Sequence, residues 1–167
     1  MLTWVPQFAA KKGCDVVSFS NTASKEADAL SFGASAYYTL EATRNLQKPG
    51  SIDVLIITAP MMPDWSLYLP LLAPKAKIFP LTIGPENVSL PGMPLLMMGI
   101  TVQGSVLAPK GVHERMLEFA AKNGVKPKVH RFEMDLKGVE EAFATLKEGR
   151  MRYRGVLVVP EDKKLVV

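Results

Sequence analysis

The sequence predicts an α/β fold built on a doubly wound parallel sheet, and three observations support this prediction. Short apolar runs typical of strands alternate with amphipathic helical patterns along the chain. One run, residues 53–59, is almost continuously apolar, as expected for a strand that helices cover on both faces. The third observation is that 167 residues, 48% hydrophobic and 22% charged, suit a single globular domain.

The N-terminal elements are predicted from apolar spacing and from the glycines that interrupt it. Residues 5–12 have a helical pattern that ends at Gly13, and the lysines before this glycine complement the helix dipole. A strand-length run at 16–19 gives way to small polar residues and to a second helical pattern at 25–32, for which Ser24 is a candidate cap. A short aromatic strand at 36–39 follows, and a polar connection leads on to Gly50.

The middle of the chain contains apolar runs bounded by prolines. The predicted strand 53–59 carries Thr58 at its carboxyl end, where open α/β sheets bind ligands. A short helix is predicted at 65–72. A further strand is predicted at 77–83, in which Pro80 favours an irregular or terminal position. The methionine-rich residues 95–104, which include the next strand, are typical of a core or an interface.

The C-terminal third is predicted to contain two amphipathic helices and two strands. The first helix ends at residues 123–124, and a strand follows at 129–134. Asp135 is placed to cap the second helix, which stops at Gly149. The apolar positions of this second helix are Leu136, Val139, Phe143 and Leu146. Residues 155–159 are predicted to form the last strand.

Composition excludes several classes of function. The net charge of +4 is spread along the chain, so we predict no nucleic-acid partner. Cys14 is the only cysteine and His113 and His130 are the only histidines, too few for a zinc site, so no metal is expected in this chain. Cys14 is expected to pack as a small hydrophobe, and the lack of a disulfide framework suits a reducing, cytoplasmic compartment. No segment is long enough to span a membrane.

The turn after the first strand is the candidate ligand site. In nucleotide-binding βαβ units an acidic residue near this position holds a ribose 2′-hydroxyl, and an NADP site avoids a carboxylate there. Here the strand is followed by Ser20, Asn21 and Thr22, and Lys25 can supply positive charge for a 2′-phosphate. An ordinary strand-to-helix turn is the alternative interpretation, and the chain lacks a glycine-rich phosphate loop.

Six short segments, in this order and at this spacing, are informative together: residues 7–13, 20–25, 32–34, 104–105, 118–122 and 152–154. Through them the chain, from about Gln7 onward, resembles the C-terminal half of a zinc-containing medium-chain alcohol dehydrogenase of the cinnamyl-alcohol-dehydrogenase-like, NADP-preferring branch. The resemblance implies one partial NAD(P)-binding domain over residues 1–167, a Rossmann-type sheet that lacks its first strand. Residues from about 150 would return to a catalytic domain outside this chain. Because the absent strand is the central one, the strands at 15 and 53 are expected to lose ladder partners unless they close up on each other, and apolar surface is expected to be exposed.

The resemblance also implies the roles of the site residues. It assigns no catalytic residue and no metal ligand to this chain, since the family's zinc ligands lie in the other half. The implied coenzyme-binding residues are Ser20, Asn21, Thr22 and Lys25 for the adenosine ribose and 2′-phosphate, Thr58, Gly84, Ser105, Val106 and Leu107 along the coenzyme, and Arg154 at its pyrophosphate. Asn21 departs from the pattern, since relatives often have arginine or serine there.

The implied function is that of an oxidoreductase transferring hydride between NADP and an alcohol or aldehyde, with NAD the less favoured coenzyme. Without the zinc domain, we expect no alcohol dehydrogenase activity from this chain alone. The alternative is a non-catalytic module that binds NADP or dimerises. In the family that the chain resembles, subunits dimerise by joining their sheets, which implies a homodimer contact in the region from Leu95 to Val102.

Overall fold

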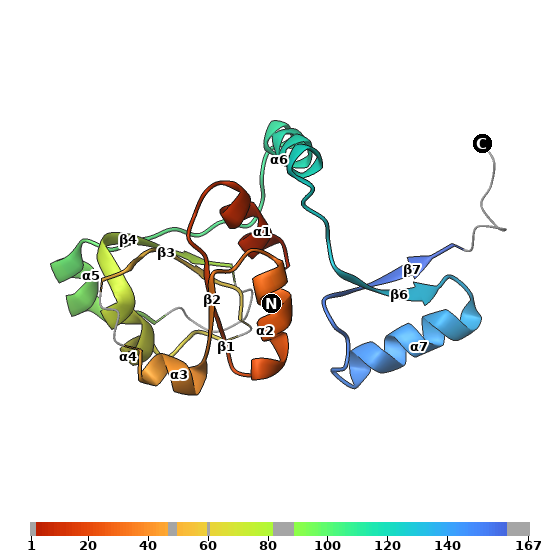
Figure 1. The fold of residues 1–167 in the computed structure, drawn as a ribbon, viewed down its shortest axis with the longest axis horizontal. Helices are drawn as coiled ribbons and strands as arrows, with labels where there is room; N and C mark the ends of the chain where they lie inside the picture. The colour runs from red at the N-terminus through yellow and green to blue at the C-terminus, as the bar shows by residue number, and fades with distance from the viewer. Residues whose placement is uncertain (1–2, 47–49, 60, 82–88, 160–167) are drawn as a thin grey trace.

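The computed structural model describes residues 3–46, 50–59, 61–81 and 89–159. Helices and strands alternate along most of the chain (Figure 1). The elements are α1 (Trp4–Lys11), β1 (Val17–Ser20), the 3-10 helix η1 (Ala23–Lys25), α2 (Glu26–Ser31), β2 (Ala36–Thr39), α3 (Leu40–Arg44), β3 (Ile52–Ile57), α4 (Trp65–Tyr68), the 3-10 helix η2 (Leu69–Leu71), β4 (Leu72–Pro80), α5 (Gly92–Met98), β5 (Thr101–Val102), α6 (Lys110–Asn123), β6 (Val129–Glu133), α7 (Leu136–Lys147) and β7 (Arg154–Val158).

Among the described residues all strand pairs are parallel, as predicted, but they form three separate sheets. β1 pairs with β2, β3 with β4 and β4 with β5, and β6 pairs with β7. Within the described residues β1 and β3 share no ladder, so each has one edge without a strand partner. This confirms the expectation that these two strands lack a common neighbour. The sheet is therefore divided at the position where a doubly wound fold has its central strand.

The main core lies between β3, β4 and η2. Leu72 and Ile78 are fully buried there, and Leu55 and Ile57 of β3 are 8% and 5% exposed. The expectation that this strand is buried on both faces was wrong, because Val54 on its other face is 48% exposed. A strand with one uncovered face contributes less apolar burial than a central strand normally does.

The C-terminal residues form a β6–α7–β7 unit that extends to one side of the molecule (Figure 1). α7 is capped as predicted, since the Gly138 N–H donates a hydrogen bond of 2.7 Å to Asp135 Oδ1. The predicted apolar positions lie on α7, but the side chains of Leu136, Phe143 and Leu146 are 76%, 69% and 60% exposed. The predicted exposure of apolar surface is thus confirmed, and part of it lies on this helix.

The N-terminal helix holds the end of α6 in place. Phe8 of α1 stacks on Phe119 of α6 with ring centroids 5.7 Å apart. Gln7 makes two hydrogen bonds with the backbone of Lys126, donating at 2.9 Å and accepting at 3.2 Å. These contacts fix the point from which the chain continues into the β6–α7–β7 unit.

Several local predictions differ from the structure. A short helix, α3, replaces the expected polar connection, because Thr39 caps it by accepting a hydrogen bond of 3.3 Å from the Ala42 N–H. β4 begins at Leu72 rather than at residue 77. Cys14 is exposed instead of packing as a hydrophobe, because it lies beyond the end of α1. No helix among the described residues has the length and apolar character needed to cross a membrane.

Candidate functional site

The turn after β1 is short, polar and accessible. Asn21 and Thr22 are exposed, and the Thr22 carbonyl accepts a hydrogen bond of 2.5 Å from the hydroxyl of Tyr37 in β2. Ser24 Oγ lies 3.1 Å from Thr22 Oγ1 and does not cap α2, so the prediction of a Ser24 cap was wrong. The half-buried Lys25 immediately precedes α2 and has no ion-pair partner among the described residues.

This turn forms one wall of a pocket of about 440 Å³, within the size range of small-molecule sites. The opposite wall comes from the segment between α7 and β7. The lining residues are Ser24, Lys25, Gly149, Arg150, Met151, Arg152 and Tyr153. Three of them are cationic and none is acidic. Arg150 and Arg152 form ion pairs with carboxylates outside the lining and Lys25 forms none among the described residues, so the pocket is suited to an anion at Lys25.

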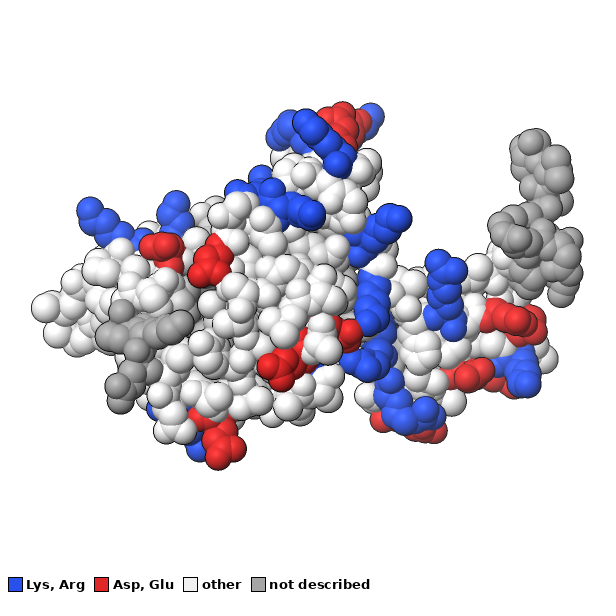
Figure 2. Space-filling view, in the orientation of Figure 1, with Lys and Arg blue, Asp and Glu red and all other residues white. Residues whose placement is uncertain are grey.

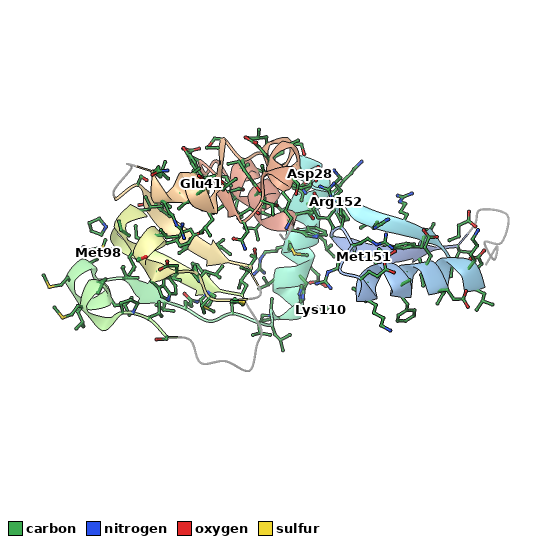
Figure 3. The ribbon with its side chains drawn as sticks, turned by 90° about the horizontal axis from the view of Figure 1, so that it is seen from below. Asp28, Glu41, Met98, Lys110, Met151 and Arg152 are labelled. Carbon is green, nitrogen blue, oxygen red and sulfur yellow. The ribbon has the colours of Figure 1, made fainter. Side chains whose placement is uncertain are left out.

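Asp28 of α2 fastens the second wall to the first. Its carboxylate accepts hydrogen bonds from Lys128 Nζ at 2.5 Å, from Arg152 Nη2 at 2.8 Å and from the hydroxyl of Tyr153. Figure 3 shows Asp28 and Arg152 side by side. The Tyr153 ring also packs edge-on against Phe32, with centroids 6.1 Å apart. We name these four residues, Asp28, Lys128, Arg152 and Tyr153, the Asp28 cluster.

The electrostatics of the Asp28 cluster keep its hydrogen bonds in place at neutral pH. The hydrogen bond from Lys128, followed by that from Tyr153, lowers the pKa of Asp28 below its ordinary value. Burial and then the hydrogen bond to Asp28 raise the pKa of Tyr153 to about 12. Asp28 therefore stays ionised and Tyr153 stays protonated, which are the two forms that this hydrogen bond requires.

The backbone of the second wall is unusual at Tyr153. Its φ of 63° lies in the left-handed region, which is rare for a bulky residue, while Gly149 at the other end of the wall has a φ of 69°. Such a conformation persists where neighbouring contacts determine it, and here the contacts with Asp28 and Phe32 do so. The reversal at Tyr153 lets Arg152 meet α2 while the chain continues into β7.

Of the predicted site residues that the structure describes, Lys25 alone lines this pocket. Ser20, Asn21 and Thr22 precede it in the chain and are not lining residues. Thr58 follows β3, and Ser105, Val106 and Leu107 lie exposed between β5 and α6. Arg154 is the first residue of β7, paired with Val129, and does not line the pocket. Gly84 lies outside the described residues. Sequence reasoning missed Asp28, Arg150 and Tyr153, although the dense basic group at residues 150–154 was a usable signal.

The side chains that the structure describes do not fit a zinc ion. In the part of the chain that the structure describes, no three His, Cys, Asp or Glu residues are grouped so that they could hold a metal. A zinc site requires at least three such ligands around one point.

Parallel strands joined by helices, with a basic pocket beside the first of them, define an α/β protein of the Rossmann type. Solved structures share this fold. A cinnamyl alcohol dehydrogenase from Sorghum bicolor is 23% identical with a TM-score of 0.80, over 93% of this chain and 44% of that one. The protein named CAD from Helicobacter pylori, solved in complex with NADP(H), is 23% identical with a TM-score of 0.72, over 96% of this chain and 45% of that one.

Residues 3–126 match the family model described as zinc-binding dehydrogenase, and the chain belongs to this family. The aldehyde reductase AdhA of Synechocystis is 32% identical over 154 residues, which are 90% of this chain and 45% of that protein. The NADP-dependent alcohol dehydrogenase C 1 of Mycolicibacterium smegmatis is 29% identical over 152 residues, 90% and 43% of the two chains. The predicted family is thus confirmed, and the chain spans less than half the length of these relatives.

Proposed function

We propose that this chain is the NADP-binding portion of an alcohol dehydrogenase and forms one partial coenzyme-binding domain. The observation that carries the proposal is Lys25, a cation without an ion-pair partner among the described residues, in a pocket with no acidic lining residue at the end of β1. Several relatives are named as NADP-dependent alcohol dehydrogenases, which agrees with this assignment.

Selection of NADP over NAD follows from the charges around the turn. Residues 20–22 offer hydroxyl and amide groups but no carboxylate, so a 2′-phosphate meets no like charge from them. Lys25 supplies an ammonium group within the same turn. When bound, the coenzyme supplies the hydride chemistry, and the residues of this chain bind and orient it.

We assign the adenosine ribose and its 2′-phosphate to Ser20, Asn21, Thr22 and Lys25. Thr58, at the carboxyl end of β3, is proposed to contact the coenzyme further along. Contacts of the nicotinamide half with Gly84 and with the backbone of residues 105–107 remain predictions from the family resemblance, as does that of the pyrophosphate with Arg154. In the whole enzyme, residues from about 150 are proposed to join the catalytic domain.

We expect the chain by itself to lack alcohol dehydrogenase activity. The described residues hold no three-ligand set that could bind the zinc by which an alcohol oxygen is polarised. Coenzyme binding without turnover is therefore the proposed activity of the isolated chain.

A second candidate function is dimerisation through α5 and β5. Met93, Leu96 and Met97 of α5 are 67%, 79% and 78% exposed, and β5 pairs with β4 alone among the described strands. An apolar helix face beside an open strand edge is suited to a second copy of the same chain. Sedimentation of the wild type and of Leu96→Glu would test this, since a dimer built on α5 should dissociate in the variant.

Thermal melting with NADPH and with NADH at equal concentration tests the main proposal. A ligand that binds only the folded chain raises its melting temperature, and NADPH should do so more than NADH. Lys25→Glu should abolish the NADPH-specific shift. Lys122→Glu, the same charge change on the exposed end of α6, should retain it when each variant is compared with its own ligand-free melt. Equal shifts with both coenzymes, or none, would contradict the proposal.

A further inference from the structure

We infer that Arg150 is a second phosphate-binding residue, and that it holds the same phosphate monoester as Lys25 from the opposite wall of the pocket. This inference rests on the proposed function and deepens it. The phosphate site would then combine the turn after β1 with the segment after α7, two parts of the chain that are far apart in sequence.

The first argument is the distribution of charge. Figure 2 shows basic side chains gathered where the β6–α7–β7 unit meets the rest of the molecule. Lys25, Arg150 and Arg152 line the pocket at this junction. The pocket also offers the hydroxyls of Ser24 and Tyr153. Clustered cations with no acidic lining residue attract a multiply charged anion more strongly than a neutral or singly charged ligand.

The second argument separates the roles of the two arginines. Arg152 is bound to Asp28, a largely buried carboxylate that also accepts from Lys128 and Tyr153, and this contact positions the wall. Arg150 instead pairs with Glu148, donating from Nε at 2.6 Å. The side chains of Arg150 and Glu148 are 65% and 54% exposed, and exposed pairs of this kind are weak. A phosphate can therefore compete with Glu148 for Arg150.

The third argument is donor capacity. A guanidinium group has five N–H donors, and Arg150 directs Nε and Nη2 toward a single oxygen of Glu148. The remaining donors and the ammonium group of Lys25 match the three terminal oxygens of a phosphate monoester. A diphosphate bridge offers fewer terminal oxygens on each phosphorus, so the monoester is the better fit.

Isothermal titration calorimetry of the full chain with 2′,5′-ADP and 5′-AMP tests this inference, because these ligands differ only by the 2′-phosphate. The wild type should bind 2′,5′-ADP more tightly. Arg150→Gln should weaken binding of 2′,5′-ADP about tenfold, which corresponds to the loss of one charge-assisted hydrogen bond. It should leave binding of 5′-AMP unaffected. Glu148→Gln should strengthen binding of 2′,5′-ADP about twofold, since it removes the competing carboxylate.

Arg131→Gln is the matched control, because Arg131 is exposed on β6 and does not line the pocket. Equal effects of Arg150→Gln and Arg131→Gln would overturn the inference, as would equal losses of 2′,5′-ADP and 5′-AMP. A wild type that fails to distinguish the two ligands would instead refute the proposed NADP site itself. Discrimination by the wild type that survives unchanged in Arg150→Gln would refute only the role of Arg150.

Discussion

Arg152 donates a hydrogen bond of 2.8 Å to Asp28 Oδ2, and this contact joins parts of the molecule that no strand ladder connects among the described residues. Lys128 reaches the other carboxylate oxygen at 2.5 Å. One carboxylate on α2 thereby fastens both the segment that enters β6 and the segment that enters β7. The pocket exists because these segments lie against α2, so its integrity depends on Asp28.

Asp28→Asn should destabilise the chain by about 1 kcal/mol, because the amide keeps the shape of the carboxylate but loses its charge-assisted hydrogen bonds. The side chains of the two cations are half-exposed, at 50% for Lys128 and 60% for Arg152, and this exposure limits the loss of stability. Urea unfolding would measure the change. Asp53→Asn, the same substitution at an exposed site on β3, is the control and should leave stability within about 0.5 kcal/mol.

The free energy of unfolding at acidic pH should depend on Asp28. Folding lowers the pKa of Asp28, so its contribution is present above the unfolded value of 3.8 and is lost as pH falls through the lower folded value. Urea unfolding of the wild type and of Asp28→Asn should therefore differ at pH 6 and converge toward pH 2. A difference that is independent of pH would contradict this assignment.

The free energy of unfolding at alkaline pH should depend on Tyr153. Folding raises its pKa from 10.0 to about 12, so the stability that it contributes is complete below pH 10 and is lost as pH rises toward 12. Tyr153→Phe removes the titrating hydroxyl and should flatten the dependence of stability on pH in this range. Tyr37→Phe is the control, because the hydroxyl of Tyr37 bonds a backbone carbonyl outside the cluster. Denaturant midpoints between pH 9 and pH 11.5 would show the difference.

Gly138→Ala should be strongly destabilising. A Cβ at this position would lie 2.1 Å from the backbone oxygen of Glu133, so α7 could not keep its present distance from β6. Overpacking of this kind costs about 1–3 kcal/mol. Gly111→Ala in α6 is the matched control. There the nearest atom is the flexible end of Arg115 at 3.6 Å, and alanine should stabilise the helix by up to about 1 kcal/mol. Equal melting temperatures for the two variants would show that α7 packs differently.

Sequence alone predicted the elements whose limits are set by adjacent residues. The end of α6 at Gly124, with a φ of 65°, and the capping of α7 by Asp135 depend on residues within a few positions of each other. The residue range of β2 was also predicted from its aromatic run. The alternation of strand and helix patterns predicted the parallel pairing, and the family resemblance supplied the division between β1 and β3, which local patterns could not.

The candidate site was predicted only on the side of β1. Lys25 was found because it follows a strand that ends without a carboxylate, which is a local pattern. The opposite wall depends on the left-handed turn at Tyr153 and on its contact with Asp28, a partner far away in the sequence. The exposed face of β3 was missed for a related reason. The apolar run of this strand indicates that burial is favourable, but it does not indicate whether another element is present to cover the strand.

The described residues form three unconnected sheets, which implies that their backbone amides exchange with solvent through separate opening events. β1–β2, β3–β4–β5 and β6–β7 share no strand, so one unit can open without breaking the hydrogen bonds of another. Deuterium uptake should be slowest around Leu72 and Ile78, which are fully buried, and faster in β7, whose residues are all exposed. A ligand that spans the pocket between residues 24–25 and 149–153 would then slow uptake in two units at once, although it touches no strand of either.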